Sequence, residues 1–323
     1  MIQILVDSAG YSFRKVALLT SKGLYSIGFM RINMVNIHIP LSFNPFMKTV
    51  VIGDTKFLTM YQLRRYIFFN DVAIWADSPL EIQPFDTDCC VYTCLPCWVR
   101  IYRDIGIDVD GWIPRPIDMD IADSVANSSC RDLVEKYGNY IVTVGSDLTT
   151  YGSLPPRKGL DMFDILCSDM KSIGIRCVAV TNWMLRNAYT IRFGSLDEYE
   201  LMRLIKCAKL FIWPSRSEGF GMPPVEAMAV GQIVVSSNAP FNDLIVGVKF
   251  DYSDLKSVPV PFTPHRYMCW DYSYRDLYDA VVYALSMDED ERKKMSEKAR
   301  ESARLLDKSF IAQTIAEVLY RHG

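Results

Sequence analysis

Short runs of apolar residues alternate along the chain with longer segments in which apolar positions recur at helical spacing. The runs have the length of buried strands and the longer segments that of helices, so the pattern predicts an α/β protein with parallel sheets. The predicted strands are 2–6, 32–39, 49–53, 72–75, 90–93, 140–144, 176–181, 210–213 and 233–235.

Helical segments follow several of these runs. After the first strand a helical pattern continues to Gly23, and a later one, from Ser195 to Ala208, has Ser195 or Asp197 available as its N-cap. Towards the C-terminus the predicted helices are 273–285, 287–306 and 310–320. Strand, turn and helix therefore repeat in the order typical of Rossmann-like folds.

The most informative segment is 214–237, which reads PSRSEGFGMPPVEAMAVGQIVVSS. It follows a predicted strand and places a glycine-containing turn, Gly219–Gly221, before a short helix. Pro223 or Pro224 suits the first turn of that helix, and Gly231 suits its end. A turn at a helix N-terminus presents backbone N–H groups and the positive end of the helix dipole, which together favour an anion.

Two glutamates, Glu218 and Glu226, flank this turn with seven residues between them. Carboxylates beside an anion site are electrostatically unfavourable, so they need another task. An ionised carboxylate accepts hydrogen bonds well, and we therefore expect the pair to hold hydroxyl groups of a sugar or ribose. An ordinary strand–turn–helix unit would account for the periodicity of the segment but for neither glutamate.

The segment resembles the donor site of retaining glycosyltransferases with the GT-B fold, family 4 (glycosyl transferases group 1) in particular. The resemblance rests on the two glutamates, on the EGFG and EAMA strings, and on the strand after Gly231. It implies two Rossmann-like domains facing a cleft, with the C-terminal helix crossing back to the N-terminal domain. The expected domains are a short acceptor domain at 1–115, a donor domain at 116–306 and the returning helix at 307–323.

The same resemblance assigns roles to individual residues. Lys158, in the string Arg157-Lys158-Gly159 before a helix, is expected on the donor diphosphate, and Arg157 is expected to compensate for Ser146, where the family often has an arginine. Glu218 and Lys158 are the expected catalytic residues. Donor binding is implied for Gly10, Arg157, Lys158, Phe193, Glu218, Gly219, Phe220, Gly221, Met222 and Glu226.

The implied reaction moves a sugar from a UDP-, GDP- or ADP-sugar to a hydroxyl group of a glycan, lipid or protein, with retention at the anomeric carbon. The chain is thus expected to be an enzyme of the hexosyltransferase type. Lys158, Arg157 and the N–H groups near 219–221 can supply positive charge to the leaving diphosphate. Neither a metal ion nor a cofactor is therefore expected.

Two alternatives remain open. Asp86-Thr-Asp88 and Asp118-Met-Asp120 spell the Asp-x-Asp motif of metal-dependent GT-A enzymes, and their oxygen ligands suit Mg²⁺ or Mn²⁺. Ser146 and the short first domain also leave room for a catalytically degenerate protein that binds a nucleotide sugar or acts as a scaffold. Product formation separates an enzyme from such a module, whereas donor binding does not.

The composition and net charge indicate which classes of binding partner to expect. The chain has 323 residues, half of them hydrophobic, and a formal net charge of −3 with scattered basic residues, which argues against nucleic-acid binding. No apolar run reaches membrane-spanning length and no secretory signal is recognisable, so the expected location is the cytoplasm. A peripheral membrane contact stays open.

Cysteine usage gives a further expectation. Nine cysteines, an odd number in a long chain, argue against a secreted disulfide framework. Cys89, Cys90, Cys94 and Cys97 form one cluster, but a structural zinc site usually needs two separated pairs. The cluster is therefore interpreted as small buried side chains.

Overall fold

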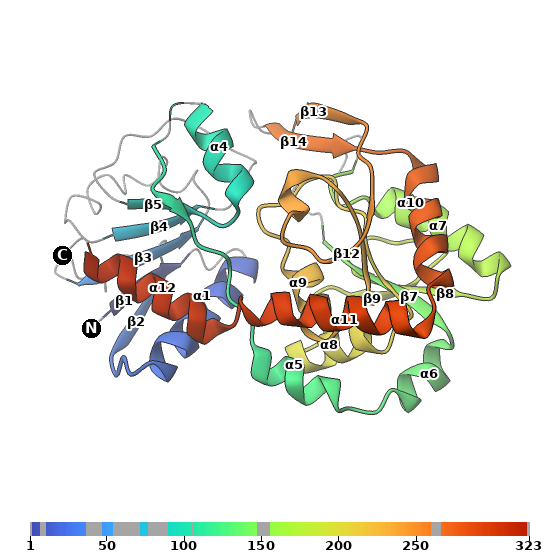
Figure 1. Cartoon of the computed structure of the whole chain (residues 1–323), viewed down its shortest axis with the longest axis horizontal. Coiled ribbons are helices and arrows are strands. Elements are labelled where there is room, and N and C mark those ends of the chain that lie inside the picture. The colour runs from blue at the N-terminus through green and yellow to red at the C-terminus, as the bar shows by residue number, and fades with distance from the viewer. Residues whose placement is uncertain are drawn as a thin grey trace. The chain divides into compact units, whose positions relative to one another are not determined.

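The computed structural model of the chain describes residues 2–6, 11–36, 47–53, 72–76, 90–104, 106, 108–146, 156–259 and 266–321. The chain divides into two compact units, one made of Met1–Asp118 with Leu306–Gly323 and the other of Met119–Leu305. Each unit contains a parallel sheet with helices packed around it (Figure 1). The α/β class predicted from the alternating pattern is confirmed.

The first unit holds a six-stranded sheet in the order β2-β1-β3-β4-β5-β6, with every pair parallel. Its strands are β1 (Ile2–Val6), β2 (Ile32–Asn36), β3 (Lys48–Gly53), β4 (Val72–Ala76), β5 (Cys90–Thr93) and β6 (Gly111–Trp112). β1 is buried along its whole length, including its polar residue Gln3. The strand order reverses beside β1, a common place for a ligand in open α/β sheets.

The C-terminal helix belongs to the first unit, as the predicted fold requires. The helices of this unit are α1 (Tyr11–Ser26), α4 (Pro96–Asp104) and α12 (Lys308–Arg321). The expectation that α1 stops at Gly23 is wrong, since Gly23 lies inside the helix. A Cβ atom there would lie 2.1 Å from the carbonyl oxygen of Lys308, so glycine allows α12 to pack directly against α1.

The buried carboxylate of Asp118 binds the first residue of α12. Ile117 forms a parallel β-bridge with Asp307. The neighbouring Asp118 accepts hydrogen bonds from Lys22, at 3.1 Å, and from Lys308. Burial alone would raise the pKa of Asp118, but the two lysines lower it below its usual value. Asp118 of the candidate Asp-x-Asp motif therefore balances two lysines, and Asp86 and Asp88 of the other candidate lie outside the described residues.

The second unit holds another six-stranded parallel sheet, in the order β12-β11-β10-β7-β8-β9. Its strands are β7 (Tyr140–Val144), β8 (Arg176–Thr181), β9 (Tyr189–Arg192), β10 (Phe211–Trp213), β11 (Val234–Ser237) and β12 (Gly247–Phe250). Read from the other edge, this is the Rossmann order 3-2-1-4-5-6, with the reversal between β7 and β10.

The helices of the second unit are α5 (Met119–Ala126), α6 (Arg131–Tyr137), α7 (Leu160–Ser172), α8 (Glu198–Lys206), α9 (Met222–Ala229), α10 (Tyr274–Ser286) and α11 (Glu289–Arg304), with a 3₁₀ turn at Pro240–Asn242. Three of them, α8, α10 and α11, begin at capping residues whose side chains accept a backbone hydrogen bond, namely Asp197, Ser273 and Asp288. Asp197, not Ser195, caps α8 in a reciprocal box with Glu200. Within the described part of the chain, no helix is long and apolar enough to span a bilayer.

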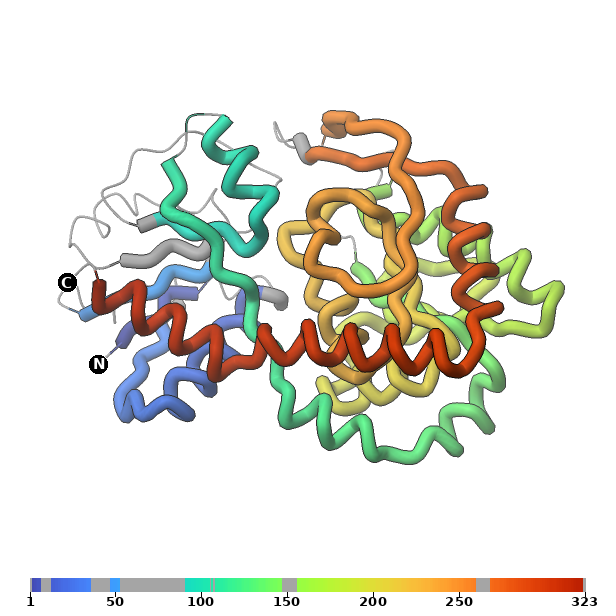
Figure 2. Tube along the Cα trace, viewed as in Figure 1, coloured from blue at the N-terminus to red at the C-terminus, as the bar shows by residue number. Residues whose placement is uncertain are grey.

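An antiparallel hairpin interrupts the α/β alternation between β12 and α10. It consists of β13 (Asp254–Pro259) and β14 (Arg266–Asp271), paired so that Asp254 faces Asp271. Figure 2 traces it in orange, apart from the strands of the main sheet. The hairpin therefore adds a separate two-stranded sheet to the second unit.

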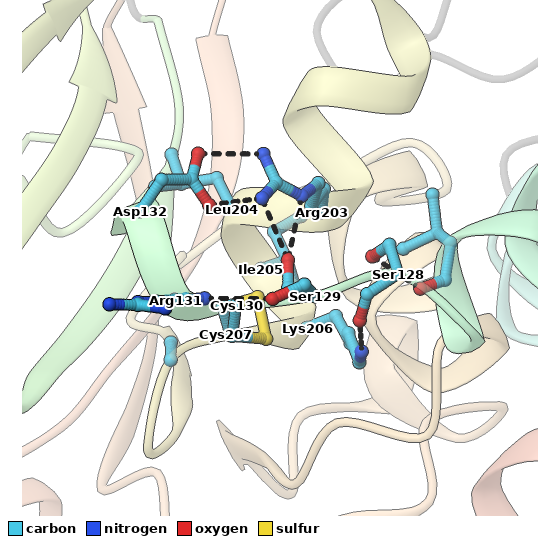
Figure 3. The surroundings of a disulfide bond; sticks show 12 residues. Ser128, Ser129, Cys130, Arg131, Asp132, Arg203, Leu204, Ile205, Lys206 and Cys207 are labelled. Carbon is cyan, nitrogen blue, oxygen red and sulfur yellow. Dashed lines mark hydrogen bonds and ion pairs between the residues drawn. A yellow bond between two sulfur atoms is a disulfide. The ribbon is translucent and has the colours of Figure 1, made fainter. Parts of the chain in front are cut away.

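One disulfide joins Cys130, before α6, to Cys207, after α8. Figure 3 shows that polar contacts reinforce the junction, because Arg203 binds Asp132 and the carbonyl of Ser129. The number of cysteines did not predict this bond, whose two cysteines lie 77 residues apart in the sequence. Of the predicted cluster of buried side chains, Cys94 is buried and reduced, and burial raises the pKa of its thiol well above the usual value. Cys97 is only half-buried, so the prediction is wrong for this residue.

Removing the disulfide is expected to destabilise the second unit. Cys130→Ser should lower its free energy of unfolding by about 2–4 kcal/mol, because the crosslink closes a long loop in the unfolded chain. Thermal unfolding with and without reductant measures this: reductant should lower the melting temperature of the wild type but not that of the variant. Equal melting temperatures for the wild type in both conditions would contradict the prediction.

Candidate functional site

The candidate site lies where the strand order of the second unit reverses. β7 ends at Val144 and is followed by Gly145, and β10 ends at Trp213 and is followed by Pro214. These two strands are neighbours and parallel, so their carboxyl ends meet at one edge of the sheet. Open α/β sheets bind ligands in the crevice beside such a reversal.

The glycine-containing turn forms the N-terminus of α9. Gly221 is the N-cap and has a left-handed backbone with φ 81°, and prolines occupy the first turn, as predicted. A Cβ atom at Gly221 would touch Pro224 at 3.4 Å and Trp213 at 3.5 Å, so the turn is closely packed. The N-terminus of α9, with the positive end of the helix dipole, therefore lies beside Trp213 at the end of β10.

Lys158 and Glu218 lie in direct contact although sixty positions separate them in sequence. The Nζ atom of Lys158 is 2.5 Å from Oε1 of Glu218, and the hydroxyl of Ser215 donates to the same oxygen at 2.6 Å. The side chains are only 13% and 7% exposed, so the ion pair is little screened by water. The ammonium group also lies 5.4 Å from the ring centre of Trp213.

The backbone before α7 brings Lys158 to this position. Gly159 adopts a left-handed conformation as the N-cap of α7, and the aliphatic part of Lys158 passes over Gly145. A Cβ atom at Gly159 would lie 1.9 Å from the carbonyl oxygen of Pro214 and 2.6 Å from the hydroxyl of Tyr272. Only glycine therefore allows this close approach of the two segments.

Arg157 joins the same two segments. Its backbone carbonyl accepts hydrogen bonds from the amide of Arg216, at 2.8 Å, and from the hydroxyl of Ser215, at 3.3 Å. Its guanidinium group donates to the carbonyl of Ser217 at 3.4 Å. Ser146, which stands where the family often has an arginine, accepts a hydrogen bond from the Asn182 amide.

Arg216 is a residue of the site that sequence reasoning missed. Its side chain is fully buried and forms two parallel hydrogen bonds to Asp161, at 2.8 and 3.0 Å, and one to Asp271 at 3.0 Å. Burial alone would lower the pKa of Arg216, but the hydrogen bond to Asp161 and the neighbouring negative charges raise it. The signal in the sequence was weak, because both acidic partners are 55 positions away.

The other predicted residues fall in three places. Phe220, Met222 and Glu226 are buried in the turn and in α9, and Gly219 is half-buried there. Phe193 follows β9, which two strands separate from β10, and it is half-buried. Gly10 lies outside the described residues. The structure thus brings Arg157, Lys158 and Glu218 together beside the N-terminus of α9.

Comparison with known proteins shows that part of the chain that forms this site is similar to a known family. Residues 186–302 match the family model described as glycosyl transferases group 1. This segment is therefore similar to that family. It includes Glu218, Glu226 and the whole of α9, whereas Lys158 lies before the match.

Similar proteins occur among filamentous viruses. The candidate glycosyltransferase 41 of Sulfolobus islandicus filamentous virus is 34% identical over 149 residues, 46% of this chain and 44% of that protein. The candidate glycosyltransferase 48 of the same virus is 37% identical over 186 residues, 56% of each chain. In these matches the chain spans about half the length of its relatives. The Escherichia coli mannosyltransferase WbdA is 38% identical over 63 residues, 20% of this chain and 8% of that protein.

Solved structures share the fold over nearly the whole chain. Anabaena HepE, solved with UDP and glucose, has a TM-score of 0.70 at 14% identity and covers 99% of both chains. Sucrose-phosphate synthase from Thermosynechococcus elongatus has a TM-score of 0.66 at 15% identity, covering 99% of this chain and 98% of its own. The trehalose-6-phosphate synthase OtsA has a TM-score of 0.64 at 12% identity, covering 95% and 76%. The chain has the GT-B fold, as predicted.

Proposed function

We propose that the chain transfers a sugar from a nucleotide diphosphate sugar to a hydroxyl acceptor, with retention at the anomeric carbon and without a metal ion. The observation that carries this proposal is the contact between Lys158 and Glu218 beside the N-terminus of α9. A cation for a leaving phosphate and a carboxylate for sugar hydroxyls lie side by side at the reversal of a Rossmann sheet. The group 1 match and the named glycosyltransferase relatives support the same reaction class.

The charges of the site suit a departing diphosphate. Lys158 supplies a point charge, Arg157 a second cation on the same loop, and the first turn of α9 contributes partial positive charge. These groups are fixed before the reaction, so they can stabilise the charge that develops on the leaving group.

Glu218 suits the sugar side of the bond. Both hydrogen bonds that the described residues donate to its carboxylate reach Oε1. Oε2 can therefore accept a bond from a sugar hydroxyl while Oε1 keeps its partners. A fixed negative charge near the sugar ring would also stabilise an oxocarbenium-like transition state, in which positive charge builds up on the ring.

A donor panel tests the proposal. UDP, GDP, ADP and their sugars should be screened by thermal shift, since a ligand at a hundredfold excess over its Kd stabilises the folded chain by about 2.7 kcal/mol. Mass spectrometry of acceptor mixtures should then detect a glycosylated product, and NMR its anomeric configuration. A chain that binds a donor but forms no product would be a binding module, and a product with inverted configuration would exclude retention.

Lys158→Ala should weaken nucleoside diphosphate binding by about 1.5–3 kcal/mol, the range for a hydrogen bond to a charged group. Calorimetry with the nucleotide selected by the panel measures the loss. The matched control is Lys171→Ala, a lysine in the last turn of α7, the helix that follows Lys158, and this variant should bind as the wild type does. Unchanged affinity in Lys158→Ala would remove this lysine from the donor site.

Chelation should leave turnover intact, because protein cations already face the expected position of the diphosphate. Initial rates would be compared in excess EDTA and in Mg²⁺ or Mn²⁺. Loss of activity in EDTA with recovery in Mn²⁺ would instead favour a metal-dependent mechanism.

A further inference from the structure

A network of charged side chains centred on the buried Arg216 links the hairpin β13–β14 to the candidate donor site. Arg216 lies between Asp161, at the start of α7, and Asp271, at the end of β14. On its other side Asp271 accepts a bond from Lys256 of β13 at 2.9 Å. The hairpin is thus joined by ion pairs to the first turn of α7.

The end of the hairpin also holds the site segment through its backbone. The amide of Trp270 donates to the carbonyl of Arg216 at 2.9 Å, and the hydroxyl of Tyr272 donates to the carbonyl of Pro214. The ring of Tyr272 lies 5.0 Å from the guanidinium carbon of Arg216. Residues 270–272 therefore contact the segment 214–216, which leads directly into Glu218.

Arg216 in turn holds the loop that carries Lys158. Besides its two bonds to Asp161, it donates to the carbonyl of Pro156 at 2.7 Å, so it binds both ends of the segment 156–161. A fully buried guanidinium is tolerated only when its partners stay in place, because an unpaired buried charge is strongly destabilising. The positions of Lys158 and Glu218 are therefore coupled to the position of Asp271.

We propose that the hairpin β13–β14 is a positioning element of the donor site, in which Asp271 acts through Arg216 to keep Lys158 and Glu218 in contact. This inference rests on the proposed function, because it concerns the site assigned to the nucleotide sugar. It gives a role to a hairpin that lies outside the six-stranded sheet of the second unit. Asp271 and Arg216 are positioning residues, since their effect reaches the donor through Lys158.

The test is a double-mutant cycle on nucleotide affinity, measured by calorimetry with UDP, GDP and ADP. Asp271→Asn keeps the shape of the side chain and should weaken binding about five- to thirtyfold, the coupling typical of residues in one network. In the Lys158→Ala background the same change should cause little further loss. Asp279→Asn is the matched control, because its partner Arg275 and its own carboxylate lie exposed on α10.

Each outcome bears on the inference. Unchanged affinity in Asp271→Asn, or a full additional loss in the Lys158→Ala background, would overturn it and leave the proposed function standing. A wild-type chain that binds none of the nucleotides would overturn the proposed function as well. A purely structural role would lower the melting temperature without coupling to Lys158, so thermal unfolding is recorded for every variant.

A second variant covers the case in which Asp271→Asn fails to fold. Tyr272→Phe removes only the hydroxyl that donates to Pro214, and it should weaken nucleotide binding in the same coupled way. A crystal structure of either variant gives a readout that needs no ligand. The contact between Lys158 Nζ and Glu218 Oε1, 2.5 Å in the wild type, should lengthen or break, and an unchanged contact would contradict the inference.

Discussion

Glu218→Gln is expected to lower kcat by roughly ten- to a thousandfold, because the negative charge of this residue acts mainly when the sugar ring becomes cationic. Glutamine keeps the size and one acceptor oxygen of glutamate, so ground-state contacts to sugar hydroxyls should largely survive. The affinity for the free nucleoside diphosphate should change little, because the variant keeps Lys158 and the hydrogen bonds of Arg216 still hold its loop in place. Steady-state kinetics and nucleotide calorimetry on the same preparations separate the two effects.

Glu226→Gln is the comparison that gives this prediction its specificity. Glu226 lies inside α9, farther along the chain from the phosphate turn than Glu218, and its expected contact is the ribose. A ribose contact is similar in the ground and transition states, so the variant should mainly raise the donor KM. If both variants turned over like the wild type, with folding checked by circular dichroism, neither glutamate would carry the chemistry.

The central strands could be predicted from the sequence because they are buried in a parallel sheet, whereas the mostly exposed edge strand β9 was not predicted. Buried strands such as β1 and β7 are mostly apolar runs, interrupted only by Gln3 and Thr143, and every position of both is buried. The glycine turn and prolines before α9 were equally local signals, since φ preferences act within a few residues. The fold class therefore followed from short-range patterns alone.

The parts that could not be predicted depend on contacts between distant segments. Gly23 gives the local signal of a helix end, but α12 packs against it and the helix continues. The bond between Cys130 and Cys207 and the ion pairs of Arg216 join positions far apart in sequence. Periodicity carries no information about such pairs, so the support around Lys158 and Glu218 became visible only in the structure.

Substitution of Gly159 tests the packing that places Lys158 beside Glu218. Gly159→Ala should lower the free energy of unfolding of the second unit by about 2–5 kcal/mol, which combines a left-handed backbone for alanine with an overpacked contact. The added Cβ atom would lie 1.9 Å from the carbonyl oxygen of Pro214, a backbone atom that cannot move without shifting the site segment. Thermal unfolding should show a melting temperature lower by about 5–20 °C, given about 2–4 °C for each kcal/mol in domains of this size.

Gly174→Ala is the matched control at the opposite end of α7. Its backbone is also left-handed, with φ 77°, but a Cβ atom there would meet nothing within 4 Å. This variant bears only the backbone cost of about 1–2 kcal/mol. The difference between the two variants therefore measures the contact between the Lys158 loop and the segment before Glu218. Equal shifts would mean that the two segments do not meet as closely as described, and the donor site would lose the packing that places its cation beside its carboxylate.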